Sequence, residues 1–183
     1  MTLTPELREA VLLTIPRLRA FAISLTGNSD RADDLVQDTL LRGLSNLDRF
    51  QPGTSIQAWL FTILRNLFYS AHRKRRREVE DLDGGLADKL SSPPEQPGHL
   101  DMQDLREALK QLPPEQLEAL LLVTVQGFSY EAAAQICGVR VGTIKSRINR
   151  ARARLSELMG VEESDDLGSD RLTKAVVQDR ARL

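Results

Sequence analysis

The chain has 183 residues, with 25 Lys or Arg against 26 Asp or Glu, and its hydrophobic content of 41% is ordinary for a globular protein. A single Cys excludes an intramolecular disulfide, and one Cys with two His is too few for a zinc site, so we expect no metal and no cofactor. No signal-peptide core and no apolar run of membrane-spanning length is present, which predicts a cytoplasmic protein without membrane contact.

The net charge of −1 conceals an alternation of basic and acidic blocks. Residues 1–80 hold 12 basic and 9 acidic side chains, and residues 102–160 hold 8 and 6. Residues 81–101 hold 1 and 5, and residues 161–183 hold 4 and 6. Because basic residues are concentrated in two blocks, the near-neutral total does not exclude a nucleic-acid partner. The aromatic content of only 4% implies a core of Leu, Ile, Val and Ala, which favours helices over sheets.

Two helices are predicted at the start of the chain. Thr4-Pro5-Glu6 is typical of a helix start, and Gly27 ends that helix, while Pro16 should kink or split it. Ser29-Asp30 opens the second helix. Its apolar residues recur at helical spacing and predict one buried stripe: Ala32, Leu35, Val36, Leu40, Leu44 and Leu47.

A third helix follows the Pro-Gly loop of residues 48–54, with Thr54 or Ser55 as its cap. It carries several aromatic side chains, of which we expect Trp59 to lie in the core, and it ends in the basic run Arg73–Arg77. Rings and amides beside a basic helix end suit single-stranded DNA, because bases stack on rings while the backbone follows the charge. The alternative is a core helix with a solvated basic end that the helix dipole favours.

Residues 81–101 change character, with Gly84-Gly85, Ser91-Ser92-Pro93-Pro94 and few apolar residues. This composition predicts a flexible acidic linker between two domains, at 5–80 and 102–160. In the second domain Asp101 should cap a fourth helix, and Pro113-Pro114 should end it and begin a fifth. Residues 161–183 predict a polar, mobile tail with at most a short helix over 171–177.

The segment from Gly127 to Leu155 predicts two short helices with a tight break at Gly138. Ser129 is a good N-cap for the first, and the second begins near Val141. Six basic residues and no acidic one lie between Arg140 and Leu155. Solvated helix faces normally mix signs, so this one-signed face favours a helix-turn-helix whose second helix enters the DNA major groove. An ordinary solvated helix surface is the alternative.

These motifs carry a family resemblance. Phe128-Ser-Tyr-Glu-Ala-Ala-Ala134 and Val141-Gly-Thr-Ile-Lys-Ser-Arg-Ile-Asn-Arg-Ala-Arg152 resemble the fourth domain of bacterial sigma factors of the extracytoplasmic-function group. Asp33-Asp-Leu-Val-Gln-Asp-Thr-Leu-Leu-Arg42 resembles the segment of the second sigma domain that docks on the clamp helices of RNA polymerase. Residues 48–66 are similar to the loop and helix that capture the opened −10 element. With Phe21-Ala and Ser24-Leu-Thr-Gly27, the match is most similar to the alphaproteobacterial general stress response subgroup.

The resemblance implies an all-α fold of two small helical domains, sigma domain 2 and sigma domain 4, joined by the linker. It implies a promoter-specificity subunit that binds core RNA polymerase and promoter DNA, is controlled by an anti-sigma factor and is monomeric when not bound. It also implies residue roles. Docking on polymerase would fall to Asp34, Gln37, Asp38 and Arg42. Contact with the −10 strand would fall to Phe50, Asn66, Tyr69, Ser70 and Arg73. Contact with a GGAA-type −35 element would fall to Arg140, Thr143, Lys145, Ser146, Arg147, Asn149 and Arg150, although Asn149 departs from the larger residues often found there.

Three other classes of protein fit the sequence less well than a sigma factor does. A conventional helix-turn-helix regulator would need a ligand pocket or a dimerisation helix, and neither is apparent in the sequence. An enzyme would need a nucleophile–base set or a phosphate loop, whereas His72, His99 and Cys137 lie in different segments, so we expect no catalysis. A helical scaffold would leave the one-signed faces without an explanation.

Overall fold

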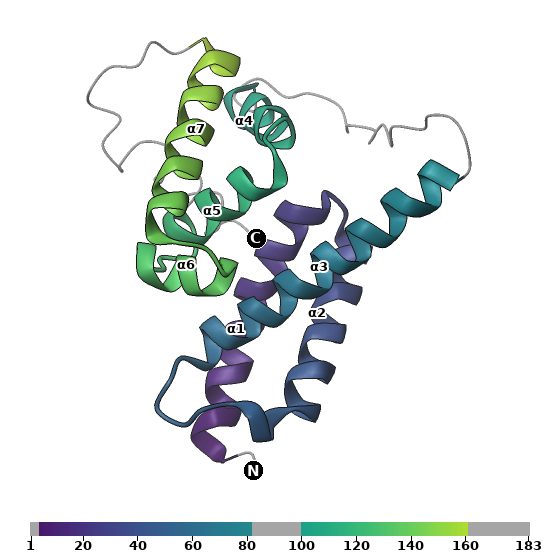
Figure 1. The fold of residues 1–183 in the computed structure, drawn as a ribbon, viewed down its shortest axis with the longest axis vertical. Coiled ribbons are helices and arrows are strands. Elements are labelled where there is room, and N and C mark those ends of the chain that lie inside the picture. The colour runs from purple at the N-terminus through teal and green to yellow at the C-terminus, as the bar shows by residue number, and fades with distance from the viewer. Residues whose placement is uncertain (1–3, 82–99, 161–183) are drawn as a thin grey trace. The chain divides into compact units, whose positions relative to one another are not determined.

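A computed structural model describes residues 4–81 and 100–160, with side chains described for 4–75 and 103–160, and over these ranges it contains helices and no strand (Figure 1). The chain divides into two compact units, Met1–Pro93 and Pro94–Leu183. The predicted all-α, two-domain fold class is therefore confirmed. Two expectations concern residues that the structure does not describe. These are the flexible linker, of which residues 82–99 are not described, and the mobile tail of residues 161–183 with its short helix.

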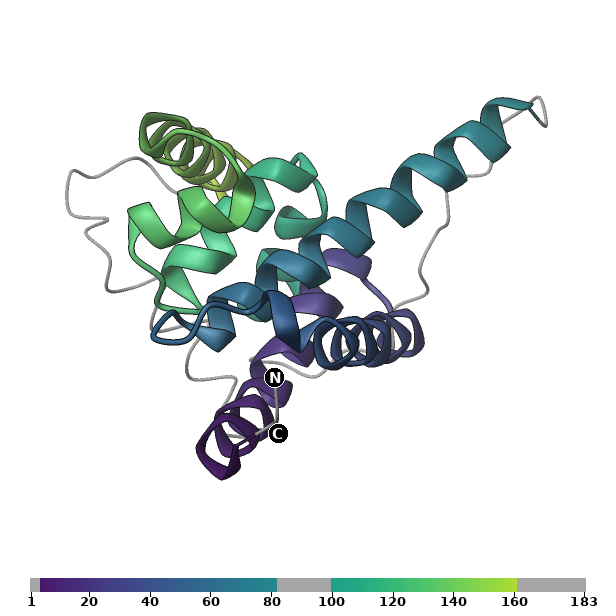
Figure 2. The same cartoon turned by 60° about the horizontal axis from the view of Figure 1, so that its bottom comes forward.

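The first unit is built from three helices: α1 (Pro5–Thr26), α2 (Ser29–Ser45) and α3 (Ile56–Asp81). A short 3-10 turn, η1 (Leu47–Arg49), begins the loop that leads into α3. All three helices pack against one another, and α3 extends beyond the α1–α2 pair as a single long rod in both views (Figures 1 and 2). At the helix starts, the side chains of Thr4 and Asn28 accept first-turn amides, and Ser55 accepts the amide of Ala58.

Helix α1 runs without interruption through Pro16, so the expected split does not occur. Proline removes one backbone donor and crowds the preceding turn, which costs about 3 kcal/mol in a helix without tertiary support. Here Thr14 and Leu18 are buried on either side of Pro16, and α1 packs on both α2 and α3. Tertiary packing thus holds the two halves of α1 in one helix.

The buried seam of α2 is made mainly of small residues. Ala32, Val36, Thr39 and Gly43 are buried, whereas Leu44 is 46% exposed, so the expectation that Leu44 belongs to the buried stripe is wrong. A Cβ atom added at Gly43 would lie 2.8 Å from Leu60 Cδ2 of α3. The small residues therefore allow α2 to approach α3 closely. Of the leucines of α2, Leu35 and Leu40 are half-buried, and Leu41 and Leu44 are exposed.

The second unit contains α4 (Leu100–Lys110), α5 (Pro114–Thr124), α6 (Tyr130–Cys137) and α7 (Val141–Met159). Helix α7 packs against the other three, and its buried residues Ile144, Ile148, Ala151 and Leu155 form one apolar stripe. Helix α4 begins at Leu100, one residue before the expected cap Asp101. Within the described part of the chain, no helix is both long and apolar enough to cross a membrane.

Candidate nucleic-acid interfaces and docking face

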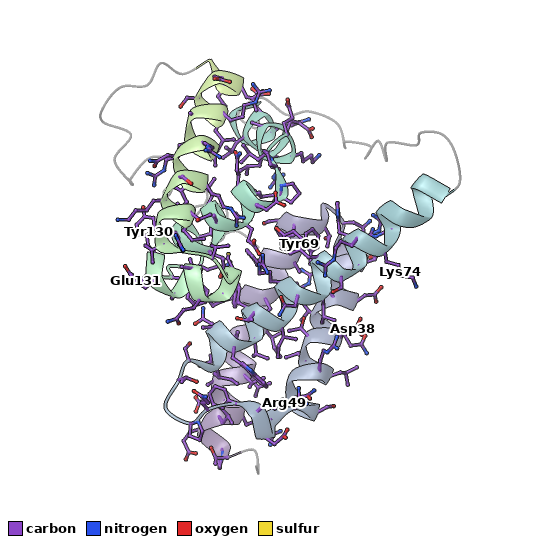
Figure 3. All side chains as sticks on the ribbon, in the orientation of Figure 1. Asp38, Arg49, Tyr69, Lys74, Tyr130 and Glu131 are labelled. Carbon is purple, nitrogen blue, oxygen red and sulfur yellow. The ribbon has the colours of Figure 1, made fainter. Side chains whose placement is uncertain are left out.

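The four residues expected to dock on polymerase are exposed on one helix. Asp34 and Gln37 lie three residues apart on α2, and Asp38 and Arg42 lie four apart. Asp38 projects away from the helix (Figure 3). The spacing of the four residues places them on the side opposite the small-residue seam, so packing of the first unit leaves them open. We call this surface, together with Leu41 and Leu44, the α2 face.

Sequence reasoning missed the apolar part of the α2 face. Leu41 is 59% exposed and Leu44 is 46% exposed. Leu41 follows Gln37 by four residues and Asp38 by three, so it lies among the predicted docking residues. Scattered exposed leucines are common, but a leucine pair within a polar surface offers apolar area that a protein partner can bury. The run Leu40-Leu41 in the sequence was the only available signal, and periodicity alone does not tell which of two adjacent leucines faces solvent.

One carboxylate beside the α2 face, that of Asp33, forms an ion pair within the first unit. Asp33 accepts two hydrogen bonds from Arg19 of α1, at 2.7 Å from Nε and 3.2 Å from Nη2. The hydrogen bond from Arg19, and then its charge, lowers the pKa of Asp33, and the same pair raises the pKa of Arg19. Asp33 therefore ties α1 to α2, while its neighbour Asp34 belongs to the α2 face.

The loop before α3 places Phe50 differently from a base-contacting residue. Phe50 is only 6% exposed, and its ring centroid lies 5.4 Å from that of Trp59. Residues 51–55 that follow are exposed. Trp59 is half-buried, so it is less enclosed than the expected core position. Phe61 and Phe21 are both fully buried, with their ring centroids 5.1 Å apart. Phe50 and Trp59 thus support the exposed loop from beneath.

The remaining −10 candidates share one side of α3. Asn66, Ser70 and Arg73 are exposed, and Tyr69 is half-buried with its ring edge-on to Phe68 at 5.2 Å (Figure 3). The guanidinium carbon of Arg65 lies 4.8 Å from the centre of the Tyr69 ring, within cation–π distance. This side of α3 therefore combines an amide, a fixed ring and positive charge, which are the groups that bind single-stranded nucleic acid.

The second unit contains the predicted helix-turn-helix. Ser129 Oγ accepts the amide of Ala132 at 3.1 Å and starts α6, and Gly138 ends it in the left-handed conformation at φ 65°. Gly138 fits there because other residues are strained at positive φ. Two residues, Val139 and Arg140, separate Gly138 from the start of α7 at Val141. The basic residues of α7 are carried on the sides away from its buried stripe.

The residues expected to contact the −35 element differ in solvent exposure. Arg140, Lys145, Ser146, Asn149 and Arg150 are exposed, and Thr143 and Arg147 are half-buried. We call these seven residues the α7 face. The Ser146 hydroxyl donates to the Thr143 carbonyl at 3.0 Å, and Arg147 Nη1 is enclosed without a hydrogen-bond partner.

No side chain caps the start of α7, in contrast to α1, α2 and α6. The Thr143 amide donates to the Arg140 carbonyl at 2.9 Å. The first-turn amides before it, together with the positive end of the helix dipole, favour binding of an anion such as a DNA phosphate. The start of α7 thus carries unsatisfied donors on the same helix as the basic residues.

The start of α6 contacts one residue of the α7 face. Lys145 Nζ lies 5.8 Å from the centre of the Tyr130 ring. Hydrogen bonds from its own backbone amide and from Ser129 lower the pKa of Glu131, and the charge of Lys145 lowers it further. Tyr130 and Glu131 project from the beginning of α6 (Figure 3). Lys145 therefore has an aromatic and an acidic neighbour on the adjacent helix.

Comparison with known proteins bears on both units. Residues 11–78 match the sigma-70 region 2 family, and residues 102–155 match the sigma-70 region 4 family. The ECF RNA polymerase sigma factor EcfG of Rhodopseudomonas palustris (strain TIE-1) is 60% identical over 177 residues, which are 97% of this chain and 98% of the relative.

Two solved structures of sigma factors are similar to this chain in fold. The sigma factor RpoE of Bartonella quintana, in complex with the anti-sigma factor NepR, matches with a TM-score of 0.77 and 51% identity, over 87% of this chain and all of that chain. CnrH, in complex with the cytosolic domain of CnrY, matches with a TM-score of 0.61 and 28% identity, over 85% of this chain and 91% of that chain. The chain described here therefore belongs to the ECF RNA polymerase sigma factors, with a region 2 and a region 4 domain of the sigma-70 family.

Proposed function

We propose that this sigma factor directs core RNA polymerase to promoters of general stress response genes and that an anti-sigma factor controls it. The observation that carries the proposal is the presence, in one chain, of an exposed acidic and apolar helix face and a basic helix-turn-helix. A conventional DNA-binding regulator would need only the second. The 60% identity to EcfG supports the subgroup.

In the proposed mechanism the α2 face docks on polymerase. The α7 face enters the major groove of the −35 element, where Lys145 and Arg150 donate to base edges or phosphates. The uncapped start of α7 supplies further donors to the DNA. This contact fixes where the polymerase stands on the promoter.

The other DNA contact captures an unpaired base of the −10 element. Asn66 hydrogen-bonds the flipped base, and Tyr69, Ser70 and Arg73 follow the strand along α3. Taking a base out of the stack costs a few kcal/mol, and stacking contributes about 1–3 kcal/mol per base. Opening of the duplex thus becomes favourable mainly at the correct sequence. Phe50 contributes by supporting the loop of residues 51–55 through its contact with Trp59.

The relative from Bartonella quintana was solved with the anti-sigma factor NepR. We infer that a protein of this kind binds the present chain and competes with core polymerase. Purified NepR added before core polymerase should then suppress transcription, whereas NepR added to a preformed open complex should suppress it much less. If NepR leaves transcription unchanged in both orders of addition, this outcome would contradict control of this chain by NepR.

The test of the main proposal is run-off transcription with core polymerase on a template that carries a GGAA-type −35 element. The chain should be required for a transcript, and the double variant Lys145→Ala/Arg150→Ala should lose it. Arg154→Ala is the matched control, because Arg154 pairs with Glu157 at 2.9 Å within α7 and should leave transcription intact. Tight binding of the free chain to duplex DNA, without a transcript or binding to core polymerase, would instead indicate a conventional regulator.

A further inference from the structure

We propose that Tyr130 and Glu131 are positioning residues that hold Lys145 in the orientation in which it reads the −35 element. This inference rests on the proposed function, since it assigns a role to two residues that support one of the proposed DNA contacts. Neither residue was among the expected contacts.

The contact joins the two helices of the helix-turn-helix. Lys145 lies in the second turn of α7 and is exposed, yet its ammonium group lies 5.8 Å from the centre of the Tyr130 ring on α6. An ammonium group over the face of an aromatic ring is attracted by the ring's negative face. The Tyr130 ring, which is half-buried, therefore provides a surface for an otherwise flexible lysine side chain.

Glu131, which follows Tyr130 in the chain, adds a negative charge at the start of α6. It lies in the first turn of α6, where its own backbone amide and Ser129 hold the carboxylate. Its negative charge attracts the Lys145 ammonium group across the two helices. Lysine has three donors, so one can face Glu131 while another reaches guanine O6 or N7.

The arrangement has two opposing effects on DNA binding. An acidic residue beside the groove repels phosphates and weakens contact with any sequence. A lysine that is already oriented loses less side-chain freedom when it binds its base, which strengthens contact with the correct sequence. The first effect lowers affinity for both promoters alike, and the second raises affinity for the matched −35 element alone, so the ratio of the two affinities increases. The pair would thus act on discrimination more than on total affinity.

The experiment compares two promoters with full-length chain assembled into holoenzyme. One promoter carries the matched −35 element and the other a scrambled one, and the ratio of the two dissociation constants measures discrimination. Lys145→Ala should lower this ratio roughly tenfold, within the range for one base contact. Tyr130→Leu and Glu131→Gln should each lower it about two- to fivefold, as expected for an exposed cation–π or ionic contact, and Tyr130→Phe should retain it.

A double-mutant cycle separates the possible outcomes. If the inference is correct, Tyr130→Leu and Glu131→Gln have no further effect on the ratio in a Lys145→Ala chain. Equal effects with and without Lys145, or equal loss on both promoters, would overturn the inference, because they indicate direct DNA contact or a general loss of fold. An unchanged ratio in Lys145→Ala itself would instead remove Lys145 from the proposed −35 contacts.

Discussion

The α2 face and the α7 face are both solvent sides of amphipathic helices, but they differ in composition. The α2 face has charges of both signs around two exposed leucines, Leu41 and Leu44. The α7 face has basic and uncharged polar residues, and no large apolar side chain of α7 is exposed. Apolar area stabilises a contact only when a partner excludes water from it, whereas uniform positive charge suits phosphates. The difference indicates a protein partner for α2 and a DNA partner for α7.

The strongest test of this comparison removes the apolar part of the α2 face. Leu41→Asp combined with Leu44→Asp should weaken binding to core polymerase at least about 30-fold, because buried apolar anchors commonly contribute 2 kcal/mol or more. Fluorescence anisotropy with labelled chain measures this affinity. Leu13→Asp is the matched control, since Leu13 is 70% exposed on α1. An equal loss in the control would mean that no particular helix face is responsible.

A second test compares one glycine on each helix. Gly43→Val should destabilise the first unit by about 2 kcal/mol, within the usual cost of overpacking, because even a Cβ atom would meet Leu60 at 2.8 Å. Gly142→Ala in α7 has open space and should stabilise by up to about 1 kcal/mol through helix propensity. Urea unfolding of each variant measures its change in the free energy of unfolding. Equal effects of the two substitutions would contradict a close α2–α3 approach at Gly43.

A third test examines the electrostatic character of the α7 face. Arg150→Ala should weaken holoenzyme binding to the promoter by about fivefold to tenfold and reduce the slope of log affinity against log salt by about 1, as expected for one phosphate contact. Titrations at several salt concentrations give the slope. Arg154→Ala removes the same charge from α7 and should leave the slope nearly unchanged. A matching slope change in both variants would show that only net charge matters.

The smallest effect concerns the two adjacent carboxylates of α2. Arg19 lowers the pKa of Asp33 in the folded chain, so the pair stabilises the fold above the unfolded pKa of about 3.9 and loses this contribution as pH falls through the lowered folded value. Asp33→Asn should therefore reduce the decline of stability between pH 5 and the acid limit, without weakening polymerase binding. Asp34→Asn should instead weaken polymerase binding. Thermal unfolding across pH, with the same anisotropy assay, distinguishes them.

Helix ends and the helix-turn-helix were predictable from the sequence because they depend on local chemistry. Thr4 and Ser129 accept first-turn amides, and Gly138 adopts the left-handed conformation that the break requires. The positions of Leu44, Trp59 and Phe50 were not predictable, because they depend on how closely helices from different parts of the chain approach. Leu44 lies outside the buried seam of small residues, and contact with Trp59 placed Phe50 beneath the loop.

The uncapped start of α7 has a consequence for the free protein. Without a side-chain acceptor, the first amides of α7 should exchange hydrogen with solvent readily in the free chain and slowly in the promoter complex, where a phosphate takes the place of the missing cap. The DNA would then complete the helix that reads it. Arg140→Asp would supply a cap in advance. The isolated chain would gain helix stability, and the DNA would lose both the vacant amide donors and the proposed contact of Arg140. Local stability and promoter affinity should therefore change in opposite directions.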